Sequence, residues 1–221
     1  MYCHFQKFID SAQPLCIDGT LNSTSFNQFW QDVALQAAAI AQMENLTWAL
    51  WEADSYEFLV LFFAALLAKK QILLPPNRVR ELEQDFSAQQ IYFLKRQEIG
   101  EVVPLSLTLD DTFLEQAQLY FYTSGSTGEP KKIPRTLRQL LNEVQGLSQS
   151  FSFDEHATAI ATVSHQHIYG LLFKLLLPLA RGRSFYNPQM AFPEDVVQAH
   201  KQFETMGLFN YLSSSTALLK C

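Results

Sequence analysis

An unbroken run of eleven apolar residues, 58–68, lies between two shorter apolar segments. The run is too short for a membrane span, which takes about 20 residues, and because it is apolar on every side it predicts a fully buried helix. Asp54 and Glu57 just before it are typical of a helix start. The flanking segments, 46–51 and 71–74, are predicted strands. A strand, a helix and a second strand at this spacing make a βαβ unit with parallel strands, so the sequence predicts an α/β fold.

Other segments extend this pattern to a mostly parallel sheet flanked by helices. Ser25 with Gln28, and Thr136 with Gln139, form capping-box patterns that each precede an amphipathic helix. Pro178 is expected to shorten one of the later helices. Further strands are predicted at 90–94, 105–109, 119–122, 158–163, 183–186 and 208–212, and further helices at 78–86, 169–180 and 193–203. We expect one domain over 1–221, with a βαβ region at about 20–115 and a second region at about 116–221.

Composition and charge exclude several classes of protein. Apolar residues make up 48% of the chain and charged residues 17%, against about 25% in typical domains, so the chain is not disordered. Its net charge of -6 gives no general attraction to nucleic acid. Cys3, Cys16 and Cys221 have neither disulfide-framework nor zinc-site spacing. With no leader pattern at its start, the chain is expected to be cytoplasmic, without a membrane span.

A loop rich in glycine and hydroxyl groups follows the predicted strand at 119–122. Its glycines let backbone N–H groups turn toward a ligand, and its hydroxyls and lysine add donors, which is typical of a phosphate site. A Walker motif is excluded because Pro130 stands where that motif requires its second glycine. An ordinary solvated turn is the alternative interpretation. The loop reads Thr123, Ser124, Gly125, Ser126, Thr127, Gly128, Glu129, Pro130 and Lys131, and the nearby basic residues are Lys132, Arg135 and Arg138.

Residues 120–131, YFYTSGSTGEPK, closely resemble the phosphate-binding signature of the adenylate-forming enzymes. That superfamily comprises acyl-CoA and aryl-CoA synthetases, luciferases and the adenylation domains of peptide synthetases. The resemblance implies that the chain is the N-terminal part of the large AMP-binding domain of this family. It also implies that ATP is the nucleotide, with its phosphates bound by residues 123–128 and by Lys131.

A second stretch, 163–170, is similar to the family's His-aromatic-Gly element, matched here by His167, Tyr169 and Gly170. The resemblance implies that these residues wall the acyl pocket and that His167 is a catalytic-site residue near the substrate carboxylate. From the residues alone, His165 and His167 fit equally a neutral core or surface role. Zinc ligation is not predicted, because no third ligand stands at suitable spacing.

The resemblance implies an ATP-dependent ligase that activates a carboxylic acid and passes the acyl group to a thiol of coenzyme A or of a carrier protein. Mg²⁺ is implied as well, yet the sequence contains neither the family's Tyr-Gly-x-Thr-Glu segment, which carries the magnesium-binding glutamate, nor its Thr-Gly-Asp segment. We therefore expect the 221-residue chain alone to be inactive. The alternatives are a truncated, catalytically inactive remnant and a stand-alone nucleotide- or phosphate-binding module. Neither the acid nor the oligomeric state follows from the sequence.

Overall fold

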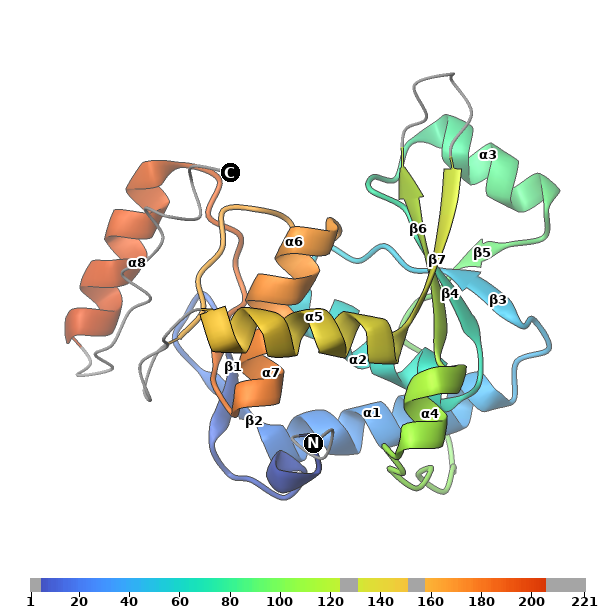
Figure 1. Ribbon diagram of the computed structural model, residues 1–221, viewed down its shortest axis with the longest axis horizontal. Coiled ribbons are helices and arrows are strands. Elements are labelled where there is room, and N and C mark those ends of the chain that lie inside the picture. Colours follow the sequence, from blue (N-terminus) through green and yellow to red (C-terminus); the bar gives the residue numbers. More distant parts are fainter. Residues whose placement is uncertain (1–4, 124–130, 151–157, 206–221) are drawn as a thin grey trace.

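The larger sheet is built from β3 (Thr47–Ala49), β4 (Gln71–Leu74), β5 (Tyr92–Phe93), β6 (Gln118–Thr123) and β7 (Lys131–Thr136). The computed structural model describes residues 5–123, 131–150 and 158–205, and within these ranges the five strands lie in the order β5-β3-β4-β6-β7 (Figure 1). Strands β3 to β6 pair in parallel, whereas β7 is antiparallel to β6. The prediction of a mostly parallel sheet flanked by helices is confirmed.

Helix α2 (Ser55–Leu67) connects β3 to β4 and forms the centre of the core. The Asp54 side chain accepts a hydrogen bond from the Glu57 N–H at 3.0 Å, which caps the helix as predicted. All residues of α2 from 58 to 66 are buried, so this helix has no solvent face. Helix α1 (Phe26–Ala41) packs along it, and the Trp30 ring meets the Phe63 ring edge-on with centroids 5.2 Å apart.

The two faces of the sheet bury different sets of side chains, as strand alternation requires. On one face, Ile72 and Leu74 join the main core with α2 and with α5 (Leu137–Ser150). On the other face, Leu73 and Tyr122 pack against Phe86 of α3 (Arg80–Ala88). Helix α5 begins with the predicted capping box, in which the Thr136 and Gln139 side chains each bond the other residue's backbone N–H.

A smaller sheet lies beside the start of α2. Its strand order is β2-β1-β8, from β1 (Pro14–Ile17), β2 (Ser23–Ser25) and β8 (Phe185–Tyr186), and β1 pairs with β8 in parallel. Before β8 the chain is helical without a break through α6 (Ile168–Gly170), a π-helical stretch (Leu171–Leu176) and α7 (Leu177–Arg181). The remaining elements are a 3₁₀ turn (Gln6–Phe8), α4 (Asp111–Gln116) and α8 (Pro193–Thr205).

Three expectations about secondary structure are wrong. Residues 105–109 form no strand. Leu109 is buried in the core and Leu105 and Leu107 are half-buried against it, while the Leu105 N–H bonds the Ala34 carbonyl of α1 and not a neighbouring strand. In the segment 158–163 only Ala159 bridges β8, at Phe185. Pro178 does not end its helix: it stands at the start of α7, directly after the π-helical stretch, and the chain stays helical to Arg181. The strand predicted at 208–212 lies outside the described residues.

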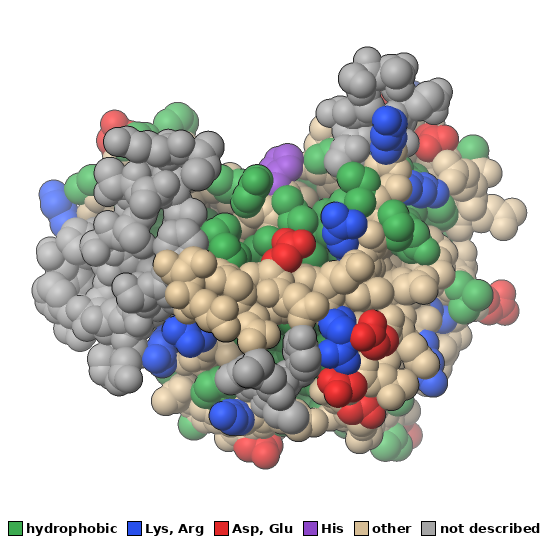
Figure 2. All heavy atoms as spheres, viewed as in Figure 1, with side chains coloured by type: hydrophobic (Ala, Val, Ile, Leu, Met, Phe, Trp, Pro, Cys, Tyr) green, Lys and Arg blue, Asp and Glu red, His purple; other side chains and the backbone are tan. Residues whose placement is uncertain are grey.

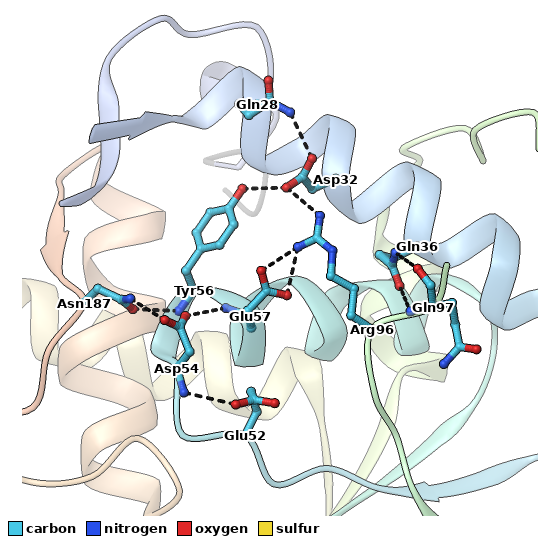
Figure 3. Close-up of polar contacts among 10 residues, drawn as sticks. All are labelled: Gln28, Asp32, Gln36, Glu52, Asp54, Tyr56, Glu57, Arg96, Gln97 and Asn187. Atoms are coloured by element: carbon cyan, nitrogen blue, oxygen red, sulfur yellow. Dashed lines mark hydrogen bonds and ion pairs between the residues drawn. The ribbon is translucent and has the colours of Figure 1, made fainter. Parts of the chain in front are cut away.

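A polar cluster ties the segment after β5 to both central helices (Figure 3). Arg96 bonds the Glu57 carboxylate of α2 at 2.6 Å and the Asp32 carboxylate of α1 at 3.1 Å. The Tyr56 hydroxyl donates to Asp32 at 3.0 Å, and burial together with this carboxylate raises the pKa of Tyr56. The cluster fixes α1 and α2 relative to the larger sheet.

Within the described ranges, none of the helices combines the length and hydrophobicity that a membrane crossing needs.

Substituting alanine for two glycines, Gly182 and Gly146, should change the free energy of unfolding in opposite directions. Gly182 ends α7 in the left-handed region at φ 65°, where an added Cβ would lie 2.3 Å from the Phe8 ring. Gly182→Ala should therefore lower the free energy of unfolding by roughly 2 kcal/mol. Gly146 lies inside α5 with nothing within 4 Å of an added Cβ, so Gly146→Ala should raise it by about 0.5–1 kcal/mol. Urea unfolding followed by circular dichroism measures both, and equal effects would contradict this assignment.

Candidate active site

The predicted phosphate loop joins two antiparallel strands at the edge of the larger sheet. Thr123, the last residue of β6, pairs with Lys131, the first residue of β7. Ser124, Gly125, Ser126, Thr127 and Gly128 lie outside the described residues. Strand β7 was not predicted from the sequence, since Pro134 stands within it, and proline is tolerated here because β7 is an edge strand.

The two lysines after the loop lie on opposite faces of this hairpin. The Lys132 Nζ lies 5.5 Å from the centre of the Tyr122 ring, which belongs to the face covered by α3. Because side chains alternate along a strand, Lys131 belongs to the other face, which is shared with α2 and α5. Lys131 is exposed. The basic residues therefore do not form one cluster, and Arg138 is paired with Asp111 at 2.9 Å.

Residues 164–170 make a tight turn that places His167 and Tyr169 on the surface. His167 directly precedes α6 and is exposed, and the Tyr169 side chain is 68% exposed. Gly170 is buried, and a Cβ on it would lie 2.1 Å from the Ser164 carbonyl oxygen. Only glycine lets the first turn of α6 approach the 164–165 backbone this closely. The turn thus depends on Gly170, one of the three residues predicted for this site.

His165, two residues before His167, points inward and is 3% exposed. Its Nε2 lies 2.8 Å from the Glu52 carbonyl oxygen, and its Nδ1 lies 3.0 Å from the Ser55 Oγ. A carbonyl only accepts, so Nε2 carries the hydrogen and Nδ1 is an acceptor that faces the serine hydroxyl, which also lies 3.1 Å from the Asn187 carbonyl. Burial lowers the pKa of His165 to about 4, helped by the positive charge of Lys174. The two histidines therefore have different roles, one buried and neutral and the other at the surface.

Lys174 is a buried cation that the sequence analysis missed. It lies in the π-helical stretch, is 1% exposed, and donates to the Ser55 Oγ at 2.7 Å and to the Asn187 carbonyl at 2.8 Å. Burial lowers the pKa of Lys174 to about 8. The signal in the sequence was a single charged residue within the otherwise apolar run 171–177.

Asn187, just after β8, contacts the start of α2 from the side of the smaller sheet (Figure 3). Its side chain donates to the Asp54 carboxylate at 2.6 Å and accepts from the Tyr56 N–H at 2.9 Å. The start of α2 is thereby held by residues more than a hundred positions away in the chain.

Among the residues that the structure describes, no three His, Cys, Asp or Glu side chains come together to hold a metal ion.

The hairpin and the His167 turn lie toward one edge of the molecule. Figure 1 shows α6 and the carboxyl end of β6 on this edge, both above α5 in the view. Figure 2 shows hydrophobic side chains exposed on the face between them, with Lys and Arg side chains over the hairpin. The carboxyl ends of parallel strands are where open α/β sheets bind their ligands.

The family model described as AMP-binding enzyme matches residues 78–206, which is more than half of the chain. The chain belongs to the AMP-binding enzyme family. The match includes both the hairpin and the His167 turn, and it confirms the resemblance to adenylate-forming enzymes.

Relatives and solved structures agree with this assignment. Malonate–CoA ligase from Mus musculus is 35% identical over 68 residues, which is 31% of this chain and 12% of that protein. 4-Coumarate–CoA ligase from Cereibacter sphaeroides is 33% identical over 93 residues, 41% of this chain and 23% of that protein. The structure of o-succinylbenzoate CoA synthetase from Bacillus subtilis superposes with a TM-score of 0.70 at 16% identity, over 92% of this chain and 47% of that one. The same synthetase has been solved with ATP and magnesium ion. The chain thus spans about half the length of the solved structures it matches and less than a quarter of these two relatives.

The burial of His165 should make the stability of this protein depend on acidity. Its folded pKa of about 4 lies below the unfolded value of about 6.5, so the unfolded chain takes up the proton first as the pH falls. The free energy of unfolding should therefore fall by about 1–3 kcal/mol between pH 6.5 and 4 because of this residue. Measured against His165→Gln, wild type should show this additional loss, whereas His167→Gln at the exposed neighbour should retain it. Identical pH dependences of wild type and His165→Gln would contradict the buried, neutral assignment.

Proposed function

We propose that this chain supplies the triphosphate-binding and acid-binding parts of a ligase that activates a carboxylic acid with ATP. The observation that carries this proposal is the 120–131 signature, placed at the carboxyl end of β6 in a chain of the AMP-binding enzyme family. The similar proteins named as malonate–CoA and 4-coumarate–CoA ligases support a carboxylic acid and coenzyme A as substrates. In this proposal the region from about 116 onward binds phosphates and acid, and the βαβ region before it supports them.

The phosphate part of the site is Thr123, the glycine and hydroxyl residues 124–128, and Lys131. Lys131 fits a triphosphate because it is exposed at the hairpin end and, within the described part of the chain, has no ion-pair partner. Donors held in place around the leaving pyrophosphate stabilise its developing charge and so lower the barrier. Mg²⁺, when bound to such nucleotides, neutralises charge on the phosphate oxygens. We assign no residue of this chain to the ion.

The acid part of the site is the turn that carries His167, Tyr169 and Gly170. His167 is proposed to lie beside the substrate carboxylate and to orient it, while Tyr169 contributes apolar wall. An oxygen of that carboxylate attacks the α-phosphorus of ATP, and the bond to pyrophosphate breaks, which leaves an acyl-adenylate. The sulfur of coenzyme A or of a carrier-protein thiol then attacks the acyl carbon, and AMP leaves with the bonding electron pair.

Lys131 and Lys132 are a matched pair for testing the phosphate site. A charge-assisted contact contributes about 1.5–3 kcal/mol, so Lys131→Ala should weaken ATP and pyrophosphate binding roughly ten- to a hundredfold. Lys132→Ala removes a charge from the α3 face, so it should change affinity by no more than about threefold, and less at high salt. Isothermal titration calorimetry of the three proteins at two salt concentrations measures both effects. Equal losses would show that a diffuse positive field, and not Lys131, binds the phosphates.

Turnover distinguishes the ligase from a nucleotide-binding module. Because the 221 residues contain neither of the two family segments for adenine and ribose, we expect them alone to bind ATP without acid-dependent exchange of labelled pyrophosphate. Joined to the C-terminal remainder of a family member, the chain should exchange pyrophosphate when an acid is supplied, and Lys131→Ala should reduce the rate at least tenfold. Tight ATP binding with no exchange in the joined protein would favour the stand-alone module.

A further inference from the structure

We propose that Lys174 is a positioning residue: through Ser55 and His165 it holds residues 165–170 against the start of α2. The functional consequence of this inference rests on the proposed function, in which His167 of the same segment binds the acid. Lys174 touches neither ATP nor acid in this scheme. It acts through a buried series of hydrogen bonds that ends at the Glu52 carbonyl.

The hydrogen bonds of this series all run in one direction. The Glu52 carbonyl must accept, so the His165 Nε2–H donates to it at 2.8 Å and the Nδ1 is left as an acceptor. The Ser55 hydroxyl has two acceptors within reach, that Nδ1 at 3.0 Å and the Asn187 carbonyl at 3.1 Å. Because the Asn187 carbonyl already accepts from Lys174, we assign the hydroxyl hydrogen to the Nδ1. The serine oxygen in turn accepts from the Lys174 Nζ at 2.7 Å. Each group can make its bond only if the previous one is oriented correctly.

The Lys174 end of the series suits an ammonium group. Its three hydrogens face three oxygen acceptors, the Ser55 Oγ at 2.7 Å and the carbonyls of Asn187 and Pro188 at 2.8 and 3.4 Å. A neutral amine keeps two hydrogens and gains a lone pair, so it no longer donates to all three oxygens, and its lone pair competes with the His165 Nδ1 for the Ser55 hydrogen. Loss of the Lys174 proton to solvent base therefore weakens the link between Ser55 and His165.

Two titratable side chains near Lys174, those of His165 and Cys16, have pKa values far from its own. Burial lowers the pKa of Lys174 to about 8, whereas His165 titrates at about 4 and the Cys16 thiol of β1 at about 12. The Asp54 carboxylate at the start of α2 is the remaining charge that acts on Lys174. Among these groups, which lie within the described part of the chain, Lys174 is thus the one whose charge changes between pH 6.5 and 9.5.

Backbone hydrogen bonds connect the anchored His165 segment to the exposed residues of the turn. The His167 N–H bonds the Ser164 carbonyl at 3.1 Å, and the Leu171 N–H bonds the His167 carbonyl at 2.9 Å. Gly170 packs so closely on residue 164 that the turn cannot shift without opening these bonds. If His165 loses its partner, the turn should open locally while the rest of α2 stays closed.

Nuclear magnetic resonance of the 221-residue protein tests this proposal without substrate. In the wild type, the ¹⁵N shift of the His165 Nδ1 should move with a midpoint near pH 8 although the ring stays neutral. Lys174→Met should abolish this movement. Ser55→Ala should abolish it too, and it decides the result if Lys174→Met does not fold. Lys95→Met, at an exposed lysine, is the matched control and should leave it unchanged.

Amide hydrogen exchange measures the positioning itself. In Lys174→Met and Ser55→Ala, the protection of the His167 and Leu171 amides should fall about tenfold, while the Ala68 amide at the far end of α2 should keep its protection. Equal losses at all three amides would mean a general stabilising role and would overturn the proposal. An Nδ1 shift that is flat from pH 6.5 to 9.5 in the wild type would overturn it as well.

The same proteins separate this proposal from the proposed function. ATP affinity should stay within about twofold in both variants, because the β6-β7 hairpin takes no part in the Lys174 series. A wild-type chain that fails to bind ATP, yet shows the His165 and amide effects, would contradict the ligase and keep Lys174 as the anchor of the turn. Normal ATP binding without those effects would keep the ligase proposal and would overturn the role of Lys174 as the anchor of the turn.

Discussion

The buried ammonium of Lys174 is the contact on which the arrangement of the site depends. It connects the start of α2 to the segment after β8, and so to the smaller sheet. Burying a charge costs several kcal/mol unless oxygen acceptors surround it, and here they do. The location is demanding for a second reason, since the N-terminus of α2 carries the positive end of the helix dipole. The nearby Asp54 carboxylate, which caps the same helix, offsets both positive charges.

The helix from 168 to 181 departs from a regular α-helical course in the stretch that carries Lys174. Its central stretch is buried on nearly every side, yet Lys174 must reach oxygen atoms on two other segments. A π-helical turn changes the angular position of the residues that follow it, and such turns recur at functional sites. The close contact at Gly170 brings the start of this helix to the 164–165 backbone. Gly170 thus restrains the 164–170 turn that contains His167, and Lys174 restrains the π-helical stretch that follows it.

The parts of the fold that were predictable from sequence are those set by local signals. The βαβ unit followed from an apolar run, an N-cap and two flanking strands, all within 30 residues. Residues 105–109 have the same apolar character as a strand, but whether a sheet neighbour is available depends on the packing of α1. The short helix α4 has an Asp110 cap that the sequence analysis did not use. Strand β7 was hidden by Pro134, which only an edge position tolerates.

For the site, a motif identifies residue types, whereas the geometry decides which of them act together. The pattern His165-x-His167 was readable as a pair, but only burial against Glu52 and Ser55 separates an anchor from a surface residue. Likewise, Lys131 and Lys132 are adjacent in the sequence, yet strand alternation places their side chains on opposite faces. No local signal relates Ser55 to Lys174, which are 119 positions apart. Their contact joins segments from different parts of the fold, so the turn that carries His167 is held by tertiary structure as well as by its own close contact at Gly170.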